Sequence, residues 1–205
     1  MDSSLDNLYR LTMGDVPKAA RMCARAFFHY PFQELVVPDE EFRAKHGELL
    51  YAFNYRLCIK HGELYGTSEK LEGVAGWVHS SVNFSIMKLL RTGVLKLFKV
   101  AGLKLMRKII QIDAYCNSRR KKVSPANYMH LLTLAVDPEE QGKGHVSSLL
   151  LPMFSRLDDE GLPCVVETQT EQNASMYKHL GFEVMDESII PGTPIKNTLF
   201  IRTPR

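Results

Sequence analysis

The 205-residue chain lacks the features of several protein classes. No apolar run reaches the length of a membrane-spanning helix, and the first four residues, MDSS, lack the basic-then-apolar order of a signal peptide. The few cysteines are widely spread and contain no CxxC pair, which argues against both a disulfide framework and a zinc site. They are Cys23, Cys58, Cys116 and Cys164. We therefore expect reduced thiols, no metal, no membrane span and a cytoplasmic protein.

Internal repeats and low-complexity tracts are also missing, and what remains favours one globular domain over residues 1–205. Hydrophobic residues make up 45% and charged residues 24% of the chain, which is ordinary for such a domain. Helical and strand-like periodicities alternate along the chain, a pattern typical of an α/β layer fold. The expected strands cover about 8–12, 63–67, 71–79, 129–136, 164–167 and 196–202, and the early helices about 15–27 and 39–59.

Two close glycines separate an expected strand from an expected helix. The apolar stretch MHLLTLAV ends at Val136, and Gln141-Gly142-Lys143-Gly144 then precedes apolar residues spaced at three and four. The first N–H groups of a helix have no partner inside it and carry partial positive charge, and glycine lets a ligand approach the backbone. This order predicts a strand, a turn and a helix start that can hold an anion.

The spacing of this loop fits neither the P-loop nor the dinucleotide fingerprint, because Gly144 follows Lys143 and Ser147 stands where a third glycine would be. It resembles the coenzyme A pyrophosphate loop, Gln-x-x-Gly-x-(Gly or Ala), of the GCN5-related N-acetyltransferases. Val146 departs from that pattern, which usually has glycine or alanine there. The resemblance implies that backbone N–H groups from Gly142 to Ser147, His145 included, bind the pyrophosphate, with Lys143 adding charge.

A second motif lies further on, in EQNASMYKHLGFEVM at 171–185. Asn173 and Tyr177 are four residues apart and share a helical face, and we expect Asn173 to cap this helix. The motif also resembles the acetyltransferase family, in which the asparagine contacts the cofactor and the tyrosine lies near its sulfur. From Tyr128 to Met185 the chain is most similar to the puromycin N-acetyltransferase-like branch, through LAVDPEEQGKG, LPCVVETQT and NASMYKHLGF.

The family resemblance implies the acyl-CoA N-acyltransferase fold, with a mixed, largely antiparallel central sheet flanked by helices. It implies direct transfer of acetyl from acetyl-CoA to an amine, which we expect to belong to a small molecule. The pantetheine arm would pair with the backbone of Leu134, Ala135 and Val136, as an added strand does. Tyr177 would then protonate the departing thiolate.

The general base is open at this point. Glu167 is the first choice because its phrase, Glu-Thr, is shared with the matching branch. His79, His130 or a water molecule are the alternatives.

The least ordinary segment is a basic helical insert at about 84–123. From Lys88 to Lys122 it has 11 Lys or Arg residues and one acid, Asp113, a net charge of +10 in a chain of +3. It is interpreted as a solvated helix face, or as a lid near the acceptor site. Two functions stay open besides the small-molecule enzyme: a non-catalytic module that binds a polyanion, and an enzyme acting on protein amino groups. We expect no nucleic acid partner, and a monomer or a homodimer.

Overall fold

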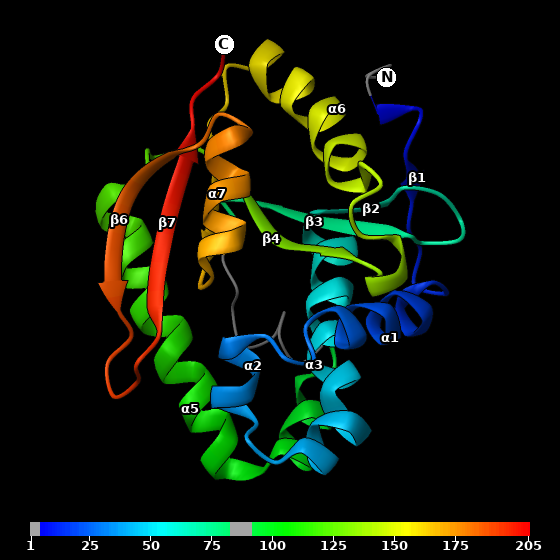
Figure 1. Cartoon of the computed structure of the whole chain (residues 1–205), viewed down its shortest axis with the longest axis vertical. Helices are drawn as coiled ribbons and strands as arrows, with labels where there is room; N and C mark the ends of the chain where they lie inside the picture. The colour runs from blue at the N-terminus through cyan, green and yellow to red at the C-terminus, as the bar shows by residue number, and fades with distance from the viewer. Residues whose placement is uncertain (1–4, 83–91) are drawn as a thin grey trace.

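The computed structural model describes residues 5–82 and 92–205, and a seven-stranded sheet forms its centre (Figure 1). The strand order is β1-β2-β3-β4-β5-β7-β6, and β4 with β5 is the one parallel pair among the strands described. The strands are β1 (Tyr9–Arg10), β2 (Glu63–Gly66), β3 (Gly73–His79), β4 (Met129–Val136), β5 (Cys164–Thr168), β6 (Glu183–Ile189) and β7 (Lys196–Arg202). The predicted fold, a largely antiparallel sheet with flanking helices, is confirmed.

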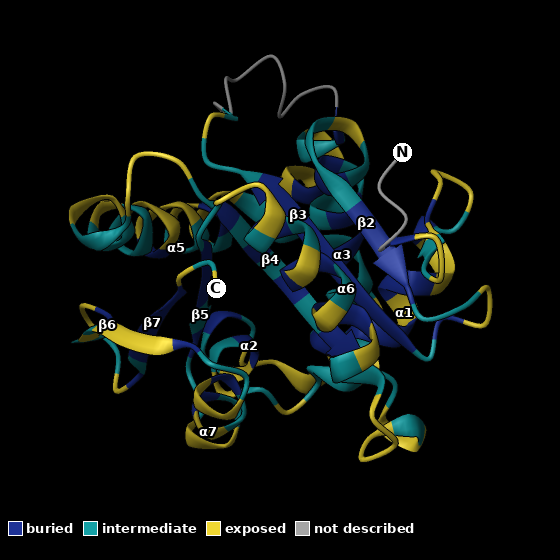
Figure 2. Cartoon of the chain, turned by 90° about the horizontal axis from the view of Figure 1, so that it is seen from above, coloured by how far each residue is buried: buried dark blue, intermediate teal, exposed yellow. Residues whose placement is uncertain are grey.

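Helices cover both faces of the sheet. They are α1 (Val16–Ala26), α2 (Pro31–Val36), α3 (Glu40–His61), α5 (Val94–Val123), α6 (His145–Asp159) and α7 (Glu171–His179), with a short 3₁₀ helix, η2 (Pro138–Glu140). One face packs against α6 and α7, and the other against α1, α3 and α5. The central strand β3 is buried between these layers, and β4 alternates between buried and partly buried residues, whereas β6 is largely exposed at the sheet edge (Figure 2). No helix in the described ranges combines the length and apolar character needed to cross a membrane.

Local sequence signals account for several helix starts. Pro17 lies in the first turn of α1, and the Asp39 carboxylate accepts a hydrogen bond from the N–H of Phe42 at the start of α3. The prediction for α7 was wrong in one respect, because the cap is Thr170, whose hydroxyl accepts from the N–H of Asn173 at 3.3 Å. Asn173 therefore lies inside the first turn of α7.

The centre of the sheet opens between β4 and β5. Their pairing is limited to Met129 with Cys164 and His130 with Val165. Just beyond, the register of β3 against β4 shifts, with Gly76 opposite Thr133 and Trp77 opposite Leu131, so Leu132 is an extra residue in β4. Because a bulge bends its strand, β4 leaves β5 at this point. The edge of β4 from Leu131 to Val136 has no pairing with β5.

The basic segment forms the long helix α5, with a break at Gly102 (φ 71°). Residues 83–91 lie outside the described part of the chain, so the predicted insert at 84–123 is seen from Val94 onward. Its C-terminal half lies against β6 and β7 (Figure 1). Arg119 forms an ion pair with Asp186 of β6 and Arg120 one with Glu167 of β5, so two of its charges are tied to the sheet.

Candidate active site

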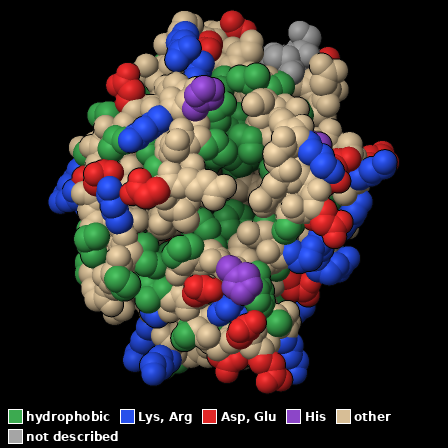
Figure 3. Space-filling view, in the orientation of Figure 1, with side chains coloured by type: hydrophobic (Ala, Val, Ile, Leu, Met, Phe, Trp, Pro, Cys, Tyr) green, Lys and Arg blue, Asp and Glu red, His purple; other side chains and the backbone are tan. Residues whose placement is uncertain are grey.

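A cavity of about 190 Å³ lies where β4 and β5 separate. Its walls are residues 131–134 of β4, 166–169 at the end of β5, Asn173 and Tyr177 of α7, and seven residues from the segment α1 to α3: Phe27, Tyr30, Phe32, Gln33, Leu50, Tyr51 and Asn54. The cavity thus joins elements from both faces of the sheet. Hydrophobic side chains gather at the centre of the face seen in Figure 3, and charged side chains lie around its rim.

Tyr177 reaches the cavity from a packed position. Only 5% of the residue is exposed, and its ring makes an edge contact with Phe182, at 5.4 Å between centroids, and a tilted contact with Phe200 at 5.9 Å. Burial raises the pKa of the Tyr177 hydroxyl well above its usual value, and nearby Tyr30 and Cys164 add to this effect. Within the described part of the chain no residue hydrogen-bonds to this hydroxyl. A protonated phenol without a hydrogen-bond partner among the described residues therefore belongs to the cavity wall.

Asn173 lines the same cavity one helical turn before Tyr177. The predicted pairing of these two residues on one face of a helix is what the structure shows. Since the cap role belongs to Thr170, the Asn173 side chain is available to a ligand in the cavity.

Glu167, the first choice for the general base, lines the cavity but is already engaged. Its Oε1 accepts from the Arg120 guanidinium at 2.8 Å, and its Oε2 accepts from the Asn197 side-chain amide at 3.1 Å. Only 11% of the Glu167 side chain and 13% of the Arg120 side chain are exposed. The carboxylate is therefore held in one orientation by two donors.

The two histidine alternatives have different positions. His130 Nε2 accepts from the same Arg120 guanidinium at 3.1 Å, and burial together with the Arg120 charge holds the pKa of His130 well below its usual value. His79 pairs with Met129 at the far end of β3 and its Nδ1 contacts the Ser81 hydroxyl at 2.7 Å. It does not line the cavity. Of the candidate bases, the structure brings only Glu167 to the cavity wall.

The glycine loop has the backbone geometry that its sequence predicts. Gly142 (φ +80°) and Gly144 (φ +85°) both have left-handed backbone, and a Cβ at either position would meet no atom within 4 Å. Gly144 precedes α6, and no side chain of the described residues caps that helix. Among the described residues, no hydrogen-bond acceptor is therefore found for the N–H groups of His145, Val146 and Ser147 in its first turn, as an anion site requires. Gln141 braces the loop through a contact from Nε2 to the Val136 carbonyl at 3.4 Å.

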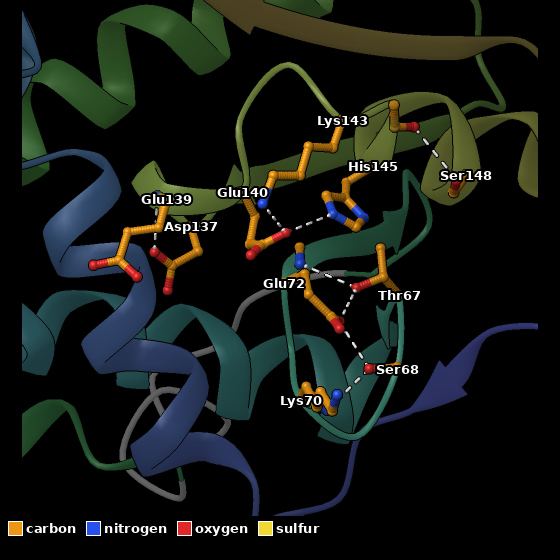
Figure 4. Close-up of polar contacts among 12 residues, drawn as sticks. Thr67, Ser68, Lys70, Glu72, Asp137, Glu139, Glu140, Lys143, His145 and Ser148 are labelled. Atoms are coloured by element: carbon orange, nitrogen blue, oxygen red, sulfur yellow. Dashed lines mark hydrogen bonds and ion pairs between the residues drawn. The ribbon is translucent and has the colours of Figure 1, made fainter.

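Charged side chains around this loop contact one another (Figure 4). Lys143 lies 2.9 Å and His145 3.4 Å from the Glu140 carboxylate, and the β2–β3 turn with Glu72 lies beside them. The Lys143 side chain is 56% exposed, so its pair with Glu140 is weak and leaves the ammonium free to move to an anion.

Val146 lies in the first turn of α6 and is partly buried. Its side chain packs against the apolar cluster under α6, which includes Leu149 and Leu150. The departure from the family pattern is thus a partly buried side chain packed against the core.

The chain is similar to known acetyltransferases in sequence and in fold. Residues 30–182 match the model of the acetyltransferase (GNAT) family, which is more than half of the chain. The chain belongs to this GNAT family. It is 27% identical, over 188 residues, to an uncharacterized N-acetyltransferase of Schizosaccharomyces pombe, covering 88% of this chain and 75% of that one.

Two solved structures share the fold of this GNAT protein. Arylalkylamine N-acetyltransferase 2 of Aedes aegypti has a TM-score of 0.69 and 14% identity, with 97% of this chain and 98% of that chain covered. A histone acetyltransferase HPA2 and related acetyltransferase of Corynebacterium glutamicum has a TM-score of 0.67 and 16% identity, covering 97% and 96%. At such identities these neighbours show the fold alone.

Several residues at this cavity were not predicted from the sequence. The aromatic residues Phe27, Tyr30 and Tyr51 lie far from both motifs in the chain, and Asn197 lies in the last strand. Arg120 was counted as one charge of the basic segment. Its ion pair with Glu167 depends on where α5 lies relative to β5, and no local sequence pattern shows this.

Proposed function

We propose that this GNAT protein transfers acetyl from acetyl-CoA to the amino group of a small molecule, by direct transfer while both are bound. The observation that carries the proposal is the cavity at the separation of β4 and β5, which is walled by Tyr177 and Asn173 on one side and by α1 to α3 on the other. A donor reaching it along β4 would meet an acceptor coming from the opposite face of the sheet.

The donor site is formed by backbone. On the edge of β4 that has no pairing with β5, alternate residues of the stretch Leu134, Ala135 and Val136 supply N–H and C=O groups for the pantetheine amides, as an added strand would use them. The first turn of α6 and the loop from Gly142 to Ser147 supply N–H groups and partial positive charge for the pyrophosphate. Acetyl-CoA contributes the activated acetyl thioester.

Tyr177 and Glu167 each carry out one proton transfer, Tyr177 as the acid and Glu167 as the base. The Tyr177 hydroxyl gives its proton to the sulfur as the carbon–sulfur bond breaks, and regains one from solvent afterwards. Glu167, oriented by Arg120 and Asn197, accepts the proton that the amine loses on forming the new carbon–nitrogen bond, through water where the amine lies further away. A backbone N–H of β4 polarises the acetyl carbonyl.

Two features weigh against the polyanion-binding alternative. Arg119 and Arg120 are paired with Asp186 and Glu167, and the Lys108 ammonium donates to the Leu35 carbonyl. The charges of these three residues support the fold, whereas six other basic residues of α5 are exposed, so a polyanion-binding module stays the second candidate. The exposed residues are Lys96, Lys99, Lys104, Arg107, Lys121 and Lys122. The puromycin N-acetyltransferase-like branch remains a prediction, as does a cytoplasmic location, which the four free cysteines favour.

The test is a coupled binding and turnover experiment on the whole chain. Titration with acetyl-CoA measures donor binding, and release of free thiol from acetyl-CoA in the presence of a panel of amines measures transfer. We expect saturable binding and amine-dependent thiol release. Binding without thiol release from any amine, with protein lysines acetylated instead, would move the acceptor class to protein amino groups.

A further inference from the structure

The charge balance of the cavity restricts which amines can occupy it. Among the cavity residues of the described chain, Glu167 is the only one with a charged side chain, and its carboxylate is already paired with Arg120 at 2.8 Å. Gln33, Asn54, Gln169 and Asn173 are polar but neutral. The cavity therefore offers no uncompensated negative charge to a cationic ligand.

Aromatic rings form the acceptor side of the cavity. Phe27 makes an edge contact with Tyr30, at 5.1 Å between centroids, and stacks on Tyr51 at 5.7 Å. The Tyr30 hydroxyl is tied across to β5, at 3.0 Å from the Thr168 hydroxyl and at 3.0 Å from the Gln169 N–H that it accepts from. These contacts fix a preformed wall of three rings beside the neutral polar groups of the cavity, and aromatic rings of this kind pack well against a flat apolar group.

Monoamines and diamines differ in the charge that they carry into the cavity. An amine that accepts acetyl loses its proton before it attacks, so its charge is gone at the reacting position. A second ammonium or guanidinium keeps its charge throughout, and burying it without a counterion is costly. Only a ligand whose remote end is uncharged therefore matches this cavity.

We infer that the acceptor is a primary monoamine carrying an aromatic or bulky apolar group, and not a polyamine or a guanidinium amine. The inference rests on the proposed function, because it takes the cavity as the acceptor site. Its volume of about 190 Å³ supports a compact ligand. Phenethylamine is a suitable probe of the expected class, and agmatine of the excluded class.

The experiment compares the two probes on the whole chain at pH 8, with kcat/KM from thiol release and Kd from titration of the protein with each amine. We expect phenethylamine to be favoured over agmatine by about 10-fold or more in both quantities, since each 1.4 kcal/mol corresponds to about tenfold. Equal values, or a preference for agmatine, would overturn the inference.

Two neighbouring arginines provide a matched pair of variants. Arg120→Met leaves the Glu167 carboxylate without its counterion in the cavity, so the preference for phenethylamine should fall about tenfold. Arg119→Met breaks the pair with Asp186, outside the cavity, and should leave the preference unchanged. Equal effects of the two changes would contradict the assigned role of Arg120. Thermal unfolding checks that each variant folds, and where Arg120→Met does not, the comparison of probes on the unaltered chain decides.

The binding measurement separates this inference from the proposed function. Tight binding of phenethylamine and weak binding of agmatine, without thiol release, would contradict the proposed transfer while supporting the class of amine that the cavity binds. Thiol release with agmatine as the better acceptor would support the transfer and contradict the acceptor class.

Discussion

Replacement of Tyr177 by phenylalanine removes one oxygen from the cavity and little else. The ring contacts with Phe182 and Phe200 do not involve the hydroxyl, and within the described residues the hydroxyl has no hydrogen-bond partner to lose. The free energy of unfolding should therefore change by less than about 1 kcal/mol. The backbone groups expected to bind coenzyme A are also untouched, so the acetyl-CoA Kd should stay within about twofold.

Turnover should respond differently. General acid catalysis contributes about 10²- to 10⁴-fold in rate. The effect expected here is near the lower end, since burial raises the pKa of Tyr177 and makes it a weaker acid, and a thiolate can also leave without a proton. We predict a fall in kcat of about 10²-fold, or about 2.7 kcal/mol in activation free energy.

The assay follows thiol release from acetyl-CoA at saturating amine, with the acetyl-CoA Kd measured separately. Tyr128→Phe is the matched control, because Tyr128 packs beside Val165, Leu199 and Ile201 and does not line the cavity. It should leave kcat unchanged. An unaltered kcat in Tyr177→Phe would remove this residue from the chemistry, and an equal fall in the control would point to a general loss of packing.

Three further changes test the donor loop and its support. Gly144→Ala forces alanine into left-handed backbone (φ +85°) and should weaken acetyl-CoA binding about fivefold or more. The control Gly161→Ala (φ +63°), at the other end of α6, should lower only the unfolding temperature. Equal acetyl-CoA affinities of the two variants would contradict this. The family pattern alone predicts that Val146→Gly tightens acetyl-CoA binding. Because this valine packs against the core, we expect the change to cost about 1–2 kcal/mol of stability without tighter binding. Calorimetry measures the binding and urea unfolding measures the stability. Hydrogen bonds from Ser68 and Thr67 lower the pKa of Glu72 from 4.5 to about 2, so its stabilising contribution is complete above about pH 4.5 and is lost as the pH falls toward 2. The unfolding temperature of Glu72→Gln should therefore lie below that of the unaltered chain at pH 6, and the gap should shrink below about pH 4.5 and close as the pH falls to about 2. A constant gap would refute the assignment.

The motifs were readable from the sequence because they are local. The strand at 129–136, the last strand at 196–202 and the start of α6 after Gly144 follow from apolar periodicity and glycine spacing, and each lies where it was predicted. The helix α2 at Pro31–Val36 was not predicted, since six residues give too little periodicity.

The acceptor side could not be predicted in the same way. The cavity depends on the separation of β4 from β5, which follows from a bulge at Leu132 that no residue type in the apolar run MHLLTLAV marks. The pair of Arg120 with Glu167 joins residues 47 positions apart in the chain. Pairing of that kind is fixed by tertiary packing, so the sequence showed a candidate base without its partner.

Calorimetric titration of the whole chain with acetyl-CoA, at two salt concentrations, tests the central claim most directly. A cofactor held in a slot by backbone groups should bind saturably at both concentrations and lose little affinity at the higher one. Absence of saturable binding at millimolar acetyl-CoA, or binding that disappears with salt as a polyanion contact does, would contradict the assignment of this cavity and its glycine loop to acetyl transfer.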